Sequence, residues 1–226
     1  MNTQDIVTAV EAVHAAILAN EQQIESLDRA IGDGDHFINV RRGCEAITAL
    51  KAELAPMAPA QAFNRIGMKL LSTIGGASGP LIGSFFISMG RELEGSAEPD
   101  SRHFARTLPD SVEAIKSRGK AELGDKTMLD VLIPASRLLL RLADEGSDLD
   151  TLCARLKQEA EVNMLATRDM IATKGRAHFL GERALGHIDP GAKTSQVALF
   201  AVCDMVTGTL RDAPLTLSSI DQEAAP

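Results

Sequence analysis

The amino-acid sequence predicts an all-α protein built from about eight helices. Apolar residues recur at spacings of three, four and seven along most of the 226 residues, which is the period of one helix face. Runs of β-branched residues that alternate with polar ones, typical of strands, are few. Most stretches between the apolar segments are short, so neighbouring helices are expected to run antiparallel.

The N-terminal half contains four predicted helical segments, which cover residues 6–24, 40–54, 63–74 and 78–89. Pro56 and Pro59 end the second segment, because proline cannot continue a helix. Gly75 follows the third. Ser78 is the expected N-cap of the fourth, with Pro80 near its first turn.

The C-terminal half contains four more predicted helices, between Asp100 and Arg118, from about Lys126 to Ala143, from Leu149 to about Ile171, and from Thr194 to Leu210. No break in composition marks a domain boundary. We therefore expect one domain over residues 1–226, in which residues 212–226 form a weakly ordered tail.

Composition excludes two classes of partner. The formal net charge is -8, and Trp and Tyr are absent, so there is neither a basic stripe nor an aromatic platform for nucleic acid. No apolar run approaches the roughly 18 to 20 residues that span a membrane. The sequence predicts a protein that binds neither nucleic acid nor a bilayer.

The N-terminus and the cysteines favour a cytoplasmic location. The first residues carry an early acid and apolar residues at helical spacing, unlike a signal peptide. Cys44, Cys153 and Cys203 are an odd number without metal-type spacing, and they are expected to be buried free thiols in a reducing compartment.

Four glycine-rich stretches separate the predicted helices: "IGDGDH" (31–36), "IGGASGP" (74–80), "SRGKAELGDKTM" (117–128) and "ERALGHIDPGAKTS" (182–195). Taken singly, each is most simply a turn. They follow the first, third, fifth and seventh helices, however, and if successive helices alternate in direction these loops emerge at the same end. The sequence thus predicts one site assembled from all four.

The loops contain residues suited to a metal and an anion. Asp28, Asp33 and Asp35 place three carboxylates within eight residues, and such hard oxygen ligands suit Mg²⁺ better than zinc. Phe37 stands where an EF-hand beginning at Asp33 would need a ligand, which excludes that motif. "GGASG" resembles a phosphate cradle at the start of a helix. No complete Walker motif, nucleophile elbow or zinc-protease helix is present.

Four longer segments closely resemble the nucleotide-binding L subunit family of dihydroxyacetone kinases. They are "LDRAIGDGDHFINVRRG", "GGASGPLIGSFF", "GKAELGDKTMLDVLIPA" and "GRAHFLGERALGHIDPGAKTS", in the family order. The resemblance implies an eight-helix antiparallel up-and-down barrel with the nucleotide site in the loops at one end. It implies ADP or ATP and two Mg²⁺ ions as cofactors, and phosphorylation of a short ketose held on a separate K subunit.

The resemblance also implies the roles of individual residues. Asp28, Asp33 and Asp35 match the family's magnesium ligands. The expected nucleotide contacts are His36, Phe37, Ile38, Asn39, Ala77, Ser78, Gly119, Met128, Arg176, Asp189, Pro190 and Gly191. Beyond these metal and phosphate ligands, no catalytic residue is assigned.

Several alternatives stay open at this stage. His36 could simply orient a carboxylate, Met128 could be ordinary core, and Arg176 could be a solvated charge. Phe37 replaces the family's usual Gly; if that glycine needs a positive φ, Phe37 would carry roughly 1 to 2 kcal/mol of strain, or its ring could instead cover the nucleotide.

Two functions from different classes remain. One is the catalytic L subunit, and the other is a noncatalytic nucleotide-binding regulator of the same fold. The phosphoryl donor could be exchangeable ATP or a phosphohistidine protein, the M subunit.

Overall fold

The computed structural model describes residues 2–76, 78–96 and 99–208, and every regular element in those ranges is helical. The elements are α1 (Thr3–Ala19), α2 (Glu21–Ile31), α3 (His36–Thr48), α4 (Lys51–Leu54), α5 (Pro59–Thr73), α6 (Ser78–Glu92), α7 (Ser101–Gly119), α8 (Leu129–Asp144), α9 (Leu149–Ala166), the 3₁₀ segments η1 (Thr167–Asp169) and η2 (Ala177–Ala184), and α10 (Pro190–Thr207). The predicted all-α class is confirmed. The predicted tail, 212–226, lies outside the described residues.

Several helices begin where a short polar side chain caps the first turn. Asn2, Asp100, Asp148 and Asp189 precede α1, α7, α9 and α10, and each side chain accepts a hydrogen bond from the amide three residues later, at 2.6 to 3.0 Å. These bonds satisfy N–H groups that have no partner inside the helix. The caps explain why these four helices begin at these residues.

Two predicted helices are each divided. The first breaks at Asn20, where φ is -105° and ψ is 14°, and the Asn20 side-chain amide donates to the carbonyl of Ala16 at 2.9 Å. The apolar face of residues 6–24 continues across this break, so its periodicity did not reveal it. The second predicted helix begins at His36 rather than Val40 and is divided between α3 and α4.

Four other predicted boundaries are corrected. Ser78 is the first residue of α6 and not its N-cap. Helix α8 begins at Leu129, because Lys126 has a φ of 61° and cannot belong to a right-handed helix. Helix α9 ends at Ala166 and is followed by η1, and α10 begins at Pro190, where the Asp189 cap fixes its start.

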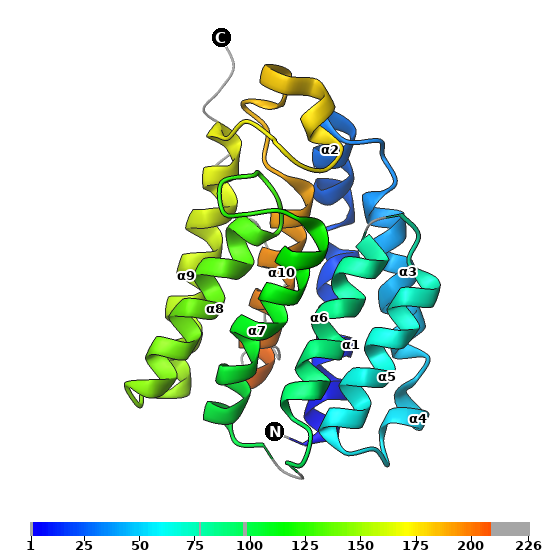
Figure 1. Ribbon diagram of the computed structural model, residues 1–226, viewed down its shortest axis with the longest axis vertical. Helices are drawn as coiled ribbons and strands as arrows, with labels where there is room; N and C mark the ends of the chain where they lie inside the picture. The colour runs from blue at the N-terminus through cyan, green and yellow to red at the C-terminus, as the bar shows by residue number, and fades with distance from the viewer. Residues whose placement is uncertain (1, 77, 97–98, 209–226) are drawn as a thin grey trace.

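The helices pack in a closed sequence of neighbours. Consecutive pairs are in contact from α5 through α10, α1 packs against α10 and α3, and α3 packs against α5. Figure 1 shows these helices running along the long axis of the molecule, while α2 and the connection between α9 and α10 lie together at one end. Helix α2 contacts η2, α3 and α10.

The core is divided among the helix pairs. The largest buried cluster joins α1, α3, α4, α5 and α6 and contains Ile6, Leu54, Phe63, Ile66 and Leu70. Smaller clusters join α8 to α9 and α10, and α7 to α8.

Cys153 and Cys203 are buried and Cys44 is half-buried, and all three are free thiols. Within the described ranges, each helix is too short or too polar to cross a bilayer.

Candidate functional site

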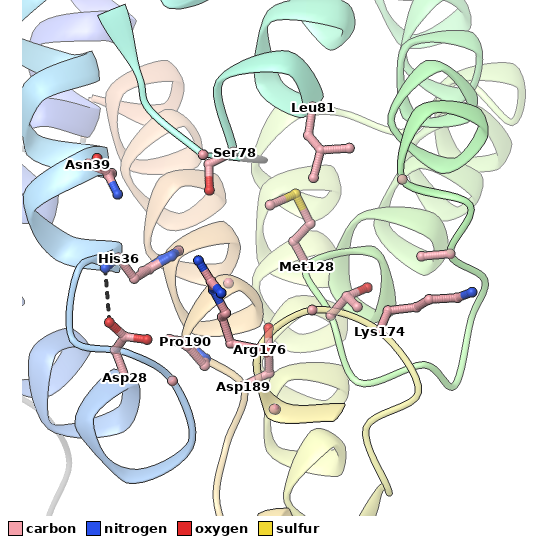
Figure 2. A pocket seen from close by; sticks show the side chains of 18 of the residues that line it. Asp28, His36, Asn39, Ser78, Leu81, Met128, Lys174, Arg176, Asp189 and Pro190 are labelled. Atoms are coloured by element: carbon pink, nitrogen blue, oxygen red, sulfur yellow. Dashed lines mark hydrogen bonds between the residues drawn. The ribbon is translucent and has the colours of Figure 1, made fainter. Parts of the chain in front are cut away.

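A cavity of about 550 Å³ lies at the end of the molecule that α2 occupies. Its walls come from the four connections on which the sequence prediction rests: the α2–α3 turn, the start of α6, the α7–α8 loop, and the α9–α10 connection. The expectation that these loops meet at one site is therefore confirmed. Figure 2 shows side chains from all four gathered around the cavity.

Three carboxylates converge on one side of the cavity. Asp28, Asp33 and Asp35 each offer an oxygen, and these oxygens lie within 4.8 Å of one another. Asp28 is buried in α2, and its Oδ2 accepts a hydrogen bond from the backbone N–H of His36 at 2.9 Å, which fixes the α2–α3 turn. A Cβ at Gly32 would lie 1.9 Å from Asp28 Oδ1, so this carboxylate position requires glycine at residue 32.

His36 is held between the carboxylates and α10. Its Nε2 lies 2.8 Å from the Thr194 hydroxyl, which itself donates to the carbonyl of Pro190 at 2.8 Å. While the hydroxyl donates to Pro190, a hydrogen bond between Nε2 and Thr194 requires the tautomer of His36 that is protonated at Nε2. Burial lowers the pKa of His36, although Asp28 and Asp35 oppose this shift. The ring thus links two walls of the cavity.

Positive side chains line the cavity, and one of them contacts a carboxylate. Arg176 Nε lies 2.8 Å from Asp33 Oδ2, and Arg118 and Lys174 also line the cavity. The Arg176–Asp33 pair is largely exposed, so the ion pair contributes little to stability and can exchange partners. A chain of net charge -8 therefore places cations where an anion could enter.

The opposite side of the cavity is apolar. Leu81 and Met128 lie together in Figure 2, apart from Asp28 and His36, and Ile115 and Leu129 complete this wall. A Cβ at Gly119 would come within 3.1 Å of a Leu81 methyl group, which makes this wall tight at the end of α7. Met128 packs against the α7–α8 core and lines the cavity as well.

The segment Asp189–Gly191 closes the site at the start of α10. Asp189 Oδ2 accepts from the amide of Ala192 at 2.7 Å, and the Asp189 N–H donates to Thr167 Oγ1 at 3.0 Å. Burial raises the pKa of Asp189 to about 7, against the stabilising amide bond from Ala192. These two hydrogen bonds join the segment to η1 through Thr167 and to the first turn of α10 through Ala192.

Most of the expected nucleotide contacts line the cavity, namely His36, Asn39, Ser78, Gly119, Met128, Arg176, Asp189, Pro190 and Gly191. Ala77 lies outside the described residues. Ile38 is half-exposed on α3 and does not line the cavity.

Neither alternative for Phe37, a strained backbone or a ring that covers the nucleotide, agrees with the structure. It lies in the first turn of α3, and its φ is not positive, so the backbone carries no left-handed strain there. Its ring is buried in a core cluster with Ile17, Ile24 and Val197 and does not cover the cavity. Any nucleotide contact at residue 37 would have to come from its backbone.

Comparison with known protein families identifies the family of this chain. The DAK2 domain matches residues 30–204, which span nearly all of the helices that build the cavity. The chain belongs to the DAK2 domain family. The matched segment begins inside α2, just beyond Asp28, and ends within α10.

Curated DAK2 relatives cover most of this chain. The ADP-binding subunit DhaL of PEP-dependent dihydroxyacetone kinase 1 from Listeria innocua is 38% identical over 183 residues, covering 81% of this chain and 86% of that protein. The corresponding Escherichia coli subunit is 37% identical over 171 residues, covering 76% and 81%. The DhaL subunit of the PTS-dependent enzyme from Lactococcus lactis is 36% identical over 191 residues, covering 84% and 91%.

A solved structure shares the fold of this DAK2 domain. The dihydroxyacetone kinase from C. freundii, in complex with AMP-PNP and Mg²⁺, superposes with a TM-score of 0.68 and is 28% identical. The match covers 88% of this chain and 33% of that enzyme, so the chain spans about a third of its length.

The DAK2 cavity also contains residues that sequence reasoning missed. Leu81, Ile115, Arg118, Lys126 and Lys174 line it. Leu81 and Ile115 were not singled out, because they fall within predicted helices where apolar residues are expected in the core. Lysine in a glycine-rich loop is normally solvated, whereas Lys126 is 1% exposed.

Proposed function

We propose that this DAK2 domain binds ADP or ATP together with two Mg²⁺ ions and is the nucleotide-binding subunit of a kinase for dihydroxyacetone or a related short ketose. The observation that carries the proposal is the convergence of Asp28, Asp33 and Asp35, with Arg176 beside them, at a cavity that also has an apolar wall. The DhaL relatives are ADP-binding subunits by name, and the C. freundii enzyme was solved with AMP-PNP and Mg²⁺. The closed sequence of helix contacts supports the eight-helix barrel that the resemblance implies.

The two sides of the cavity suit the two ends of a nucleotide. The apolar wall of Leu81, Ile115 and Met128 would hold the base, and Gly119 permits close approach of the backbone. The diphosphate would lie toward Arg176, Ser78 and the carboxylates. This orientation places negative phosphate oxygens against metal ions and cations, where their charge is compensated.

The residues of this chain would prepare phosphoryl transfer by binding and orientation. Asp28, Asp33 and Asp35 would hold Mg²⁺, which when bound neutralises charge on the phosphate oxygens. Arg176 would exchange its partner Asp33 for a phosphate oxygen, so that Asp33 becomes available to the metal. His36 would hold the Asp28 carboxylate in place through its backbone N–H, and its ring would contact Thr194 of α10.

The ketose and its binding residues would belong to a separate K subunit that meets the open cavity, in the cytoplasm. Recharging of bound ADP by a phosphohistidine M subunit and exchange of ADP for ATP both fit this arrangement. The complete carboxylate cluster favours the catalytic subunit over a noncatalytic regulator, because a regulator has no need to retain the metal ligands.

Calorimetry with ADP tests this function, using the wild-type chain and Asp33→Asn, with Mg²⁺ and with EDTA. Neutralising Asp33 removes a metal ligand from an exposed position, so ADP affinity in Mg²⁺ should fall at least tenfold, or about 1.4 kcal/mol. EDTA should weaken the wild-type affinity similarly.

Asp144→Asn is the matched control, because Asp144 is also exposed and ion-paired to an arginine, Arg106, at 3.2 Å. It should bind ADP as wild type does. Equal ADP affinity in wild type, Asp33→Asn and EDTA would refute the metal site, and the absence of ADP binding to wild type in Mg²⁺ would refute the nucleotide site.

A further inference from the structure

Lys126 makes contacts that differ from those of the other cationic residues of the site. It is 1% exposed, and its φ of 61° is a left-handed conformation that costs a non-glycine residue about 1 kcal/mol or more. Its Nζ donates to four backbone carbonyls, those of Thr167 and Ala184 at 2.8 Å, His187 at 2.7 Å and Met170 at 3.2 Å. An ammonium with three protons must share at least one of them among these acceptors.

The four carbonyls come from the two ends of one long connection. Thr167 and Met170 begin the chain between α9 and α10, while Ala184 and His187 lie near its end. The ammonium therefore joins both ends at one point. Between them lie Lys174 and Arg176, which line the cavity.

Thr167 carries this constraint to the start of α10. Its carbonyl accepts from Lys126, and its hydroxyl accepts the N–H of Asp189 at 3.0 Å while donating to Met164 at 2.7 Å. The neighbouring α7–α8 loop adds a second link, because Thr173 bonds to Asp125 through its N–H at 3.3 Å and through its hydroxyl. The connection thus depends on the loop that contains Lys126.

We propose that Lys126 is a positioning residue for phosphate binding, whose ammonium joins the two ends of the 167–187 connection and so holds Arg176 and Asp189 at the cavity. The inference rests on the proposed nucleotide function. Removing the ammonium would take a donor from all four carbonyls, leaving Thr167 with only the N–H of Met170 at 3.3 Å. The bonds to Thr167 and Ala184 are buried, and a buried acceptor that loses its donor is unfavourable. The connection would then open, whereas the helix contacts from α5 to α8 do not involve it.

The test compares Lys126→Met with Lys193→Met. Lys193 is a matched control, because it is also buried, at 5% exposure, and its Nζ donates at 2.9 Å to the Gln196 side chain on the same helix. Hydrogen exchange is measured on the unliganded proteins, and ADP affinity in Mg²⁺ is measured by calorimetry at a temperature where circular dichroism shows each variant folded.

In Lys126→Met, we expect faster exchange confined to residues 167–188, unchanged exchange in α5 and α6, and at least tenfold weaker ADP binding. Lys193→Met should bind ADP within twofold of wild type. If Lys126→Met is insoluble, Lys126→Gln, whose amide can donate two bonds, should show the same pattern with smaller amplitude.

Wild-type ADP affinity in the Lys126 variant, or exchange that accelerates equally in all helices, would overturn the inference. Failure of the proposed function has a different signature. The wild-type chain then binds no ADP, while exchange confined to 167–188 in Lys126→Met still identifies Lys126 as the residue that holds the connection.

Discussion

At Gly32, the absence of a side chain decides where the Asp28 carboxylate lies. An added Cβ would be 1.9 Å from Asp28 Oδ1 and 2.8 Å from the Asp28 carbonyl oxygen, so both cannot keep their positions. The side chain of Asp28 could rotate away, but it would then lose its bond from the N–H of His36. Glycine at residue 32 is therefore needed to keep the Asp28 carboxylate in its position.

Gly32→Ala should accordingly weaken Mg²⁺-dependent ADP binding by tenfold or more, because Asp28 is displaced from the carboxylate cluster. ADP calorimetry over a series of Mg²⁺ concentrations measures this. The variant should need more Mg²⁺ for half-maximal ADP affinity. A Mg²⁺ dependence unchanged from wild type would show that the exact position of Asp28 is unimportant.

The role of a residue could be predicted from the sequence where its partners are close by in the chain. Asp28, Asp33 and Asp35 lie within eight residues, and their convergence follows from one turn. Phe37 and Lys126 could not be predicted in this way. The burial of Phe37 depends on α10, and the four partners of Lys126 lie 41 to 61 residues further along the chain.

At the scale of elements, α5 and α6 approach closely because glycines face each other. A Cβ at Gly67 would lie 2.8 Å from the carbonyl oxygen of Gly83 and 2.6 Å from a side-chain carbon of Ile87. A Cβ at Gly83 would lie 3.0 Å from the carbonyl oxygen of Gly67. Because backbone atoms are in the way, local side-chain rearrangement cannot relieve both contacts.

Gly67→Ala should therefore destabilise the fold. Overpacking typically costs about 1 to 3 kcal/mol, and the gain in helix propensity of about 1 kcal/mol offsets only part of it. A net loss of about 1 to 2 kcal/mol should lower the melting temperature by several degrees.

Met68→Ala provides the comparison, since Met68 is the next residue of α5 and is 57% exposed. Its stability should change by no more than about 0.5 kcal/mol. A Gly67→Ala variant as stable as Met68→Ala would mean that α5 and α6 can separate without loss.

Helix existence was easier to predict than helix ends. Apolar periodicity reports which face is buried, and this face continues through the break at Asn20. Ends depend on caps and on single backbone angles, such as those at Asp189 and Lys126. The cap of α10 is an Asp followed by Pro, a recognisable start signal that the prediction placed in the preceding loop.

For the whole molecule, the alternating direction of the helices brings distant loops together. Residues 32, 76, 119 and 175 are far apart in sequence, yet all line one cavity. This consequence could be predicted from helix order and short connections. The shape of the cavity could not, because it depends on the long α9–α10 connection and on the contact of η2 with α2.

The same architecture implies that metal and nucleotide stabilise the protein together. Asp28, Asp33 and Asp35 repel one another when no cation lies among them, and four loops meet only around the cavity. Mg²⁺ reduces that repulsion, while the phosphates supply further ligands to the metal. Each component should therefore bind weakly without the other.

Thermal melts with Mg²⁺, ADP, both and neither measure this coupling. A ligand at 100 times its dissociation constant stabilises the folded state by about 2.7 kcal/mol, which raises the melting temperature of a domain of this size by roughly 5 to 10 °C. The combined shift should exceed the sum of the separate shifts, and Asp35→Ala should abolish the excess because one of the three metal ligands is missing. A combined shift that is merely additive, or that persists in Asp35→Ala, would mean that the carboxylate cluster does not couple the metal to the nucleotide.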